Sequence, residues 1–144
     1  MTPTLLGRWQ TRFFLLSTIG VLITLPFSFM RGEGIFFLIL FYVFLFGLVW
    51  DVVYHCLQKL RWDHDWIGVF QFLAGIGEAL LIAVLLNTLE LNLPGLNSRY
   101  FDLGWFTMHY TCVWLGVYVA SQTLMRIIFP RWRFRGGKLF LSKK

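Results

Sequence analysis

Charged residues are scarce in this sequence. Only 14% of its 144 residues are Asp, Glu, Lys or Arg, whereas 58% are hydrophobic and 19% are aromatic. A soluble domain of this length could not hide so much apolar surface from water. The excess has to face lipid, so we expect one integral membrane domain. A nucleic-acid-binding protein is excluded because the basic residues stand at the ends of apolar segments rather than on a soluble face.

Cysteine and histidine are also few. Cys56 and Cys112 lie in apolar segments without CxxC spacing, so we expect two small apolar side chains and no disulfide. Three histidines are too few for a histidine-rich di-iron site. His55 and His109 are predicted at different depths, which excludes a bis-histidine haem. A haem or pigment with a single axial histidine stays open as an alternative, and the sequence assigns no cofactor.

Catalytic motifs are missing as well. The sequence contains no Ser-His-Asp arrangement, no phosphate-binding loop and no dinucleotide fingerprint. The triplet Asp63-His64-Asp65 resembles a set of metal ligands, but adjacent residues rarely converge on one ion. We expect a solvated loop there, with Asp65 or Asp63 capping the helix that follows. No metal site and no enzyme activity are predicted.

Four long apolar segments divide the chain, at residues 13–30, 35–57, 66–91 and 104–129. At about 1.5 Å per residue, a helix over 35–57 can cross a hydrocarbon core of about 30 Å. The predicted fold is therefore all-α. It is an antiparallel bundle of four transmembrane helices over residues 1–130, followed by a basic cytoplasmic tail over 131–144.

The distribution of Lys and Arg predicts the orientation of the bundle. With both termini in the cytoplasm, that side holds eleven of the 13 basic residues, Arg8 and Arg12 among them, and the other side keeps Arg31 and Arg99. Cytoplasmic loops carry such an excess. We expect both termini on the cytoplasmic side of a cytoplasmic-type membrane, meaning an inner or plasma membrane or its equivalent.

Most of the candidate functional residues lie between residues 47 and 80. Asp51 and His55 are four positions apart and share a helix face. Helical rise places both near the depth of Gln71 and Arg126. Because an unpaired buried carboxylate is costly, we predict an ion pair between Asp51 and Arg126. This group is either a structural pair that fixes helix register or a site for binding or proton handling.

Glu78 is the deepest of the charged residues. It lies near the bilayer midplane in the small-residue run GIGEAL, on the helix face that also holds Gln71. Burial disfavours a charged carboxyl, so we expect a neutral group that donates one hydrogen bond. An ionised Glu78 would instead indicate a water-filled cavity or a basic partner such as His109. The alternative is a residue that handles protons, ions or a ligand.

The tail after Pro130 alternates basic and aromatic residues. Its cations are Arg131, Arg133, Arg135 and Lys138. Such a segment binds anionic lipid headgroups, at about 1 kcal/mol for each basic residue near the surface. Docking onto a partner subunit is the alternative.

Three functions are compatible with these features. The first is a non-catalytic accessory, structural or assembly subunit of a larger membrane complex, since no residue set meets a catalytic geometry. The second is a homo-oligomeric transporter, or a proton or ion path, that uses Glu78 and Asp51. The third is a membrane protein that binds haem or pigment through one histidine. The expected partners are the bilayer, its anionic headgroups, and other membrane subunits or further copies of the chain.

Overall fold

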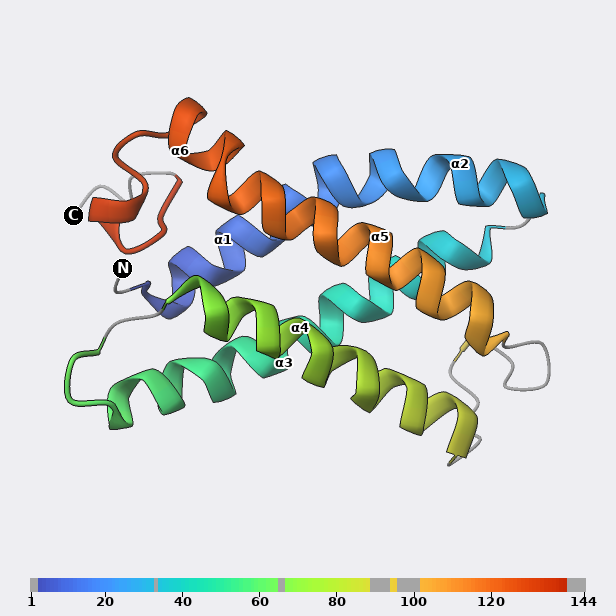
Figure 1. Cartoon of the computed structure of the whole chain (residues 1–144), viewed down its shortest axis with the longest axis horizontal. Coiled ribbons are helices and arrows are strands. Elements are labelled where there is room, and N and C mark those ends of the chain that lie inside the picture. The colour runs from blue at the N-terminus through green and yellow to red at the C-terminus, as the bar shows by residue number, and fades with distance from the viewer. Residues whose placement is uncertain (1–2, 33, 65–66, 89–93, 96–101, 140–144) are drawn as a thin grey trace.

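The computed structural model describes residues 3–32, 34–64, 67–88, 94–95 and 102–139, and this part of the chain contains helices and no strand (Figure 1). Four stretches of it are long and apolar enough to cross a membrane: Leu5–Arg31, Ile35–Leu60, Gly68–Asn87 and Leu103–Ile128. The prediction of an all-helical protein with four candidate spans is confirmed. The elements are α1 (Leu5–Leu15), η1 (Leu16–Gly20), α2 (Val21–Arg31), α3 (Ile35–Leu60), α4 (Gly68–Ala83), η2 (Val84–Thr88), α5 (Leu103–Gln122), α6 (Leu124–Ile128) and η4 (Arg133–Arg135).

The first span begins at Leu5 rather than at the predicted Phe13. Thr4 is its N-cap, and the Thr4 side chain accepts a hydrogen bond from the backbone N–H of Gly7. The span continues through the π-helical turn η1 to Arg31, where Gly32 adopts a left-handed conformation (φ 66°). The polar residues before Phe13 belong to the helix, because side chains of other helices form hydrogen bonds with them inside the bundle.

The core lies where α3, α4 and α5 meet. Phe36, Ile39 and Val43 of α3 pack there against Ile82 of α4 and Phe106 of α5. A second cluster joins the first span to α5, α6 and the segment after α6. It consists of Leu15, Ala120, Met125 and Trp132. The two clusters hold the helices together at different levels of the bundle.

The segment after α6 folds back onto α1 (Figure 1). The Thr4 N–H donates to the carbonyl of Gly136 (2.8 Å), and the Thr11 hydroxyl donates to the carbonyl of Gly137 (3.0 Å). The indole of Trp132 is buried and donates to the Thr11 hydroxyl (2.9 Å). A Cβ at Gly7 would overlap the carbonyl oxygen of Gly136, so only glycine allows this approach. The sequence did not predict this packing.

The basic side chains of that segment point away from the core. Arg131, Arg133 and Arg135 are exposed, and Lys138 is partly exposed. Their predicted contact with lipid headgroups or a partner stays a prediction.

Candidate functional site

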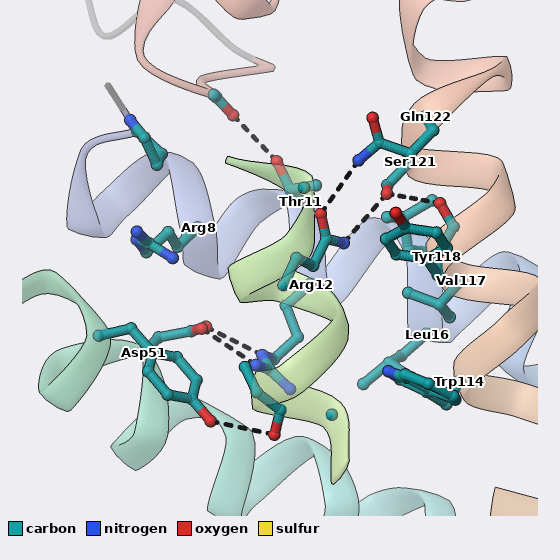
Figure 2. Close-up of a pocket in the computed structure, with 18 of the residues that line it drawn as sticks. Arg8, Thr11, Arg12, Leu16, Asp51, Trp114, Val117, Tyr118, Ser121 and Gln122 are labelled. Atoms are coloured by element: carbon teal, nitrogen blue, oxygen red, sulfur yellow. Dashed lines mark hydrogen bonds and ion pairs between the residues drawn. The ribbon is translucent and has the colours of Figure 1, made fainter. Parts of the chain in front are cut away.

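A buried ion cluster joins three helices. Arg12 of α1 donates from Nε and Nη2 to the two carboxyl oxygens of Asp51 on α3, at 2.9 and 3.0 Å. It also donates from Nη1 and Nη2 to the two oxygens of Glu78 on α4, at 3.0 and 2.9 Å. Figure 2 shows the guanidinium facing Asp51. All four carboxyl oxygens therefore accept a charge-assisted hydrogen bond from one side chain.

Glycines on α3 and α4 make room for this arrangement. A Cβ at Gly47, one helical turn before Asp51, would overlap the guanidinium of Arg12. A Cβ at Gly75 would overlap the indole of Trp114 in the same way. The backbone of α4 is also fixed here, since the Tyr110 hydroxyl donates to the carbonyl of Gly75 at 2.9 Å. The close approach of α1 and α5 to these helices thus depends on residues without side chains.

A second arginine, Arg8, lies near the cluster. Arg12 offsets one of the two carboxylates. Arg8, one turn earlier on α1, donates to Gln58 at 2.8 Å and lies near enough to Asp51 to interact with its charge. Asp51 and Glu78 are only 4% and 5% exposed, so full compensation is needed at this position.

One predicted pairing is wrong, and the hydrogen-bonding role expected for Glu78 differs from the one observed. Asp51 pairs with Arg12 rather than with Arg126, which is exposed and donates to the side chain of Gln122. Glu78 accepts hydrogen bonds from Arg12 on both carboxyl oxygens instead of donating one, and its basic partner is Arg12 rather than His109.

His109 lies on α5, where it contacts residues of α2 and α3. Its Nε2 lies 2.9 Å from the Thr24 hydroxyl, and its ring packs between Phe27 and Phe36. The side chain is 1% exposed. His109 therefore packs against the aromatic rings of Phe27 and Phe36 rather than facing an open space.

A short chain of hydrogen bonds joins α4 to α5. Gln71 Nε2 donates to the Ser121 hydroxyl (3.0 Å), and Gln122 Nε2 donates to Gln71 Oε1 (3.3 Å). Figure 2 shows Ser121 and Gln122 side by side on α5. Gln71 thus faces the bundle interior, as its spacing from Glu78 predicts. His55 is partly exposed, and its Nδ1 has no hydrogen-bond partner among the described residues.

A cavity of about 390 Å³ lies between α1, α4 and α5, beside the ion cluster (Figure 2). At its inner end it is lined by buried residues such as Val43, Glu78 and Val113. At its outer end the lining includes the exposed residues Ile67, Arg126 and Arg133. The volume lies in the range of small-molecule sites, about 300–1,000 Å³. Among the predicted site residues, Asp51, Gln71, Glu78, Arg126 and Arg133 line this cavity, whereas His55 and His109 do not.

In the loop before α4, Asp63 does not cap the helix. The N-cap of α4 is Ile67, and Asp63 pairs with Arg61 at 2.7 Å instead of capping the helix. Asp65 lies outside the described residues. Within the described ranges, no three His, Cys, Asp or Glu side chains are grouped as metal ligands.

Arg12 is the central residue that the sequence analysis missed. The sequence predicts a flanking cytoplasmic charge at this position, because it predicts that the first span begins at Phe13. One signal could have found it: Arg8 and Arg12 are four apart after a capping threonine at position 4, which places both on one face of an earlier helix.

Comparisons of the chain with protein-family models, curated proteins and solved structures found no match. Function is therefore argued from the site itself. The fold and the site define a helical protein with four candidate membrane spans in the described part, three of which are joined by a buried arginine–carboxylate cluster.

Proposed function

We propose that this protein is a small non-catalytic accessory, structural or assembly subunit of a larger membrane complex. The observation that supports it best is the saturation of the cluster. All four oxygens of Asp51 and Glu78 accept hydrogen bonds from Arg12. A carboxylate that transports ions or protons has to exchange partners, whereas these two are held by a side chain from a third helix. Such a cluster suits a scaffold that holds its helices in fixed register.

The proposed topology is an antiparallel bundle with both termini on the cytoplasmic side of a cytoplasmic-type membrane. The charge distribution supports it even after correction for Arg12. Eleven basic residues less Arg12 leaves ten on the proposed cytoplasmic side, against Arg31 and Arg99 on the other.

Native mass spectrometry after gentle extraction tests the subunit proposal. The tagged chain is purified in two different non-ionic detergents, and an unrelated four-span protein with the same tag is the control. We expect the same second polypeptide, at a fixed ratio, in both detergents and not in the control. A chain that is always alone or only self-associated contradicts the proposal.

The cavity favours a second candidate, a transporter or a proton or ion path. It reaches from the exposed Arg126 to the buried Glu78 and Asp51, as an access route to a carboxylate would. Flux into proteoliposomes tests this function. Glu78→Gln should abolish flux, and Asp63→Asn, a loop carboxylate that does not line the cavity, should leave it unchanged. Equal flux in the native chain and Glu78→Gln removes the transporter proposal.

A further inference from the structure

The cavity has more positive than negative charge in its lining. Arg8, Arg12, Arg126 and Arg133 line it, together with the carboxylates of Asp51 and Glu78. Both carboxylates are bound to Arg12. Arg126 donates to the uncharged Gln122, and neither Arg126 nor Arg133 pairs with a carboxylate of the described residues. The outer end therefore presents two guanidinium groups without an anion from the described part of the chain.

Beyond the polar side chains of Ser121 and Gln122, which lie next to Arg126, the wall of the cavity is apolar. Leu16 of η1 and Val113, Trp114 and Val117 of α5 line the cavity toward its inner end, and Figure 2 places Leu16, Trp114 and Val117 on one side of it. A ligand that enters past Arg126 thus meets cations first, then the polar side chains of Ser121 and Gln122, and then hydrocarbon side chains. This order of surfaces matches a molecule with an anionic head and an apolar body.

We propose that this cavity binds one acidic amphiphile, with its anionic group between Arg126 and Arg133 and its hydrocarbon part against Leu16, Val113 and Val117. Arginine forks bind phosphate and carboxylate oxygens in pairs. Basic sites between transmembrane helices hold anionic lipid headgroups. The shared chemistry is an anion on a hydrocarbon chain, supplied by the phosphate of a bilayer lipid or by the carboxylate of a free fatty acid. The inference does not depend on the subunit proposal, because a scaffold or a transporter could bind such a ligand.

Native mass spectrometry of the full chain in a non-ionic detergent tests this site. The protein is titrated separately with phosphatidylglycerol, oleate and phosphatidylcholine. We expect one retained molecule of an acidic amphiphile and weaker retention of the zwitterionic lipid. Stronger retention of phosphatidylglycerol identifies a membrane lipid as the source, and stronger retention of oleate identifies a free fatty acid. Equal retention of phosphatidylcholine overturns the proposal, because it removes the role of the anion.

Two pairs of arginine substitutions locate the anion. Arg126→Gln with Arg133→Gln removes the cations that line the cavity. Arg131→Gln with Arg135→Gln removes the same charge from exposed positions of the same region that do not line it. The first pair should weaken binding at least about tenfold, since two charge-assisted contacts are lost, and the second by less than about twofold. Equal weakening by both pairs means that only surface charge attracts the ligand, which overturns the site.

A second pair of variants locates the hydrocarbon part. Val117→Phe fills the cavity from α5, whereas Val119→Phe adds the same volume on the exposed face of that helix. Val117→Phe should abolish retention of the ligand, whereas Val119→Phe should leave retention unchanged. The helical circular dichroism signal of both variants should match that of the native chain. Normal retention in a folded Val117→Phe protein overturns the proposed position. If Val117→Phe does not fold, ligand retention in the two double arginine variants tests the proposed site, because those substitutions lie at exposed positions.

Discussion

Replacing Arg12 by Gln is the most direct test of the cluster. The change removes four hydrogen bonds and leaves two neighbouring carboxylates, 4% and 5% exposed, without their cation. Hydrogen bonds between membrane helices average about 0.6 kcal/mol, so four give a lower bound of about 2.4 kcal/mol. Removing one partner of a buried ion pair in soluble proteins costs about 3–5 kcal/mol. We therefore expect Arg12→Gln to lower the free energy of unfolding by about 2.4–5 kcal/mol.

Unfolding in mixed micelles of increasing SDS fraction, followed by tryptophan fluorescence, measures this loss. Arg126→Gln is the matched control, because it removes an exposed guanidinium that donates to Gln122. A surface substitution of this kind should change stability by no more than about 0.5 kcal/mol. The triple variant Arg12→Gln, Asp51→Asn, Glu78→Gln has no buried carboxylate without its cation, so it should be more stable than Arg12→Gln alone.

Two results would refute the reasoning. If Arg12→Gln and Arg126→Gln cost the same, Arg12 does not compensate buried carboxylates. If the triple variant is no more stable than Arg12→Gln, the loss comes from packing of the arginine side chain rather than from unpaired charge.

Further predictions concern the glycines that allow close approach. Gly47→Ala should destabilise the protein by about 1–3 kcal/mol in the same SDS assay, because the added Cβ overlaps the guanidinium of Arg12. Gly77→Ala is the control, because no atom lies within 4 Å of the added Cβ, and it should be neutral or stabilise the helix by up to about 1 kcal/mol. Equal effects of Gly47→Ala and Gly77→Ala on stability would contradict the predicted overlap. Gly7→Ala should separate the segment after α6 from α1, so trypsin should cleave after Arg133 or Arg135 at least about five times faster than in the native chain. Gly34→Ala, where the space is open, is the control, and unchanged cleavage in Gly7→Ala would mean that the contact contributes little.

Hydropathy was sufficient to predict the number of spans, because each apolar run exceeds the length of a bilayer crossing and needs no partner to be identified. It was not sufficient for the boundary at Leu5. Arg8 and Arg12 lower the mean hydropathy of that region, although both are helical and have partners on α3. A hydropathy profile scores each charged residue by the free energy of placing it in lipid. It cannot include a compensating carboxylate that lies 39 or 66 positions later in the sequence.

The candidate site was predicted in part for the same reason. Asp51, Gln71 and Glu78 were identified because polar groups in apolar helices need interior partners, and all three line the cavity. The identity of the partner was wrong, since helical rise gives the depth of Arg126 but not the direction of its side chain. That direction depends on helix tilt and rotation, which packing decides.

The π-helical turn η1 has a consequence for the direction of the first span's side chains. Arg12 contacts the carboxylates, and Thr24 contacts His109, so both must face the interior. They are twelve positions apart, and at about 100° per residue an unbroken α-helix would rotate them about 120° away from each other. A π-helical turn accommodates one additional residue, which reduces this offset to about 20°. The first span is therefore two α-helices of different rotational phase, and the turn between them, Leu16–Gly20, brings both polar contacts to the same side.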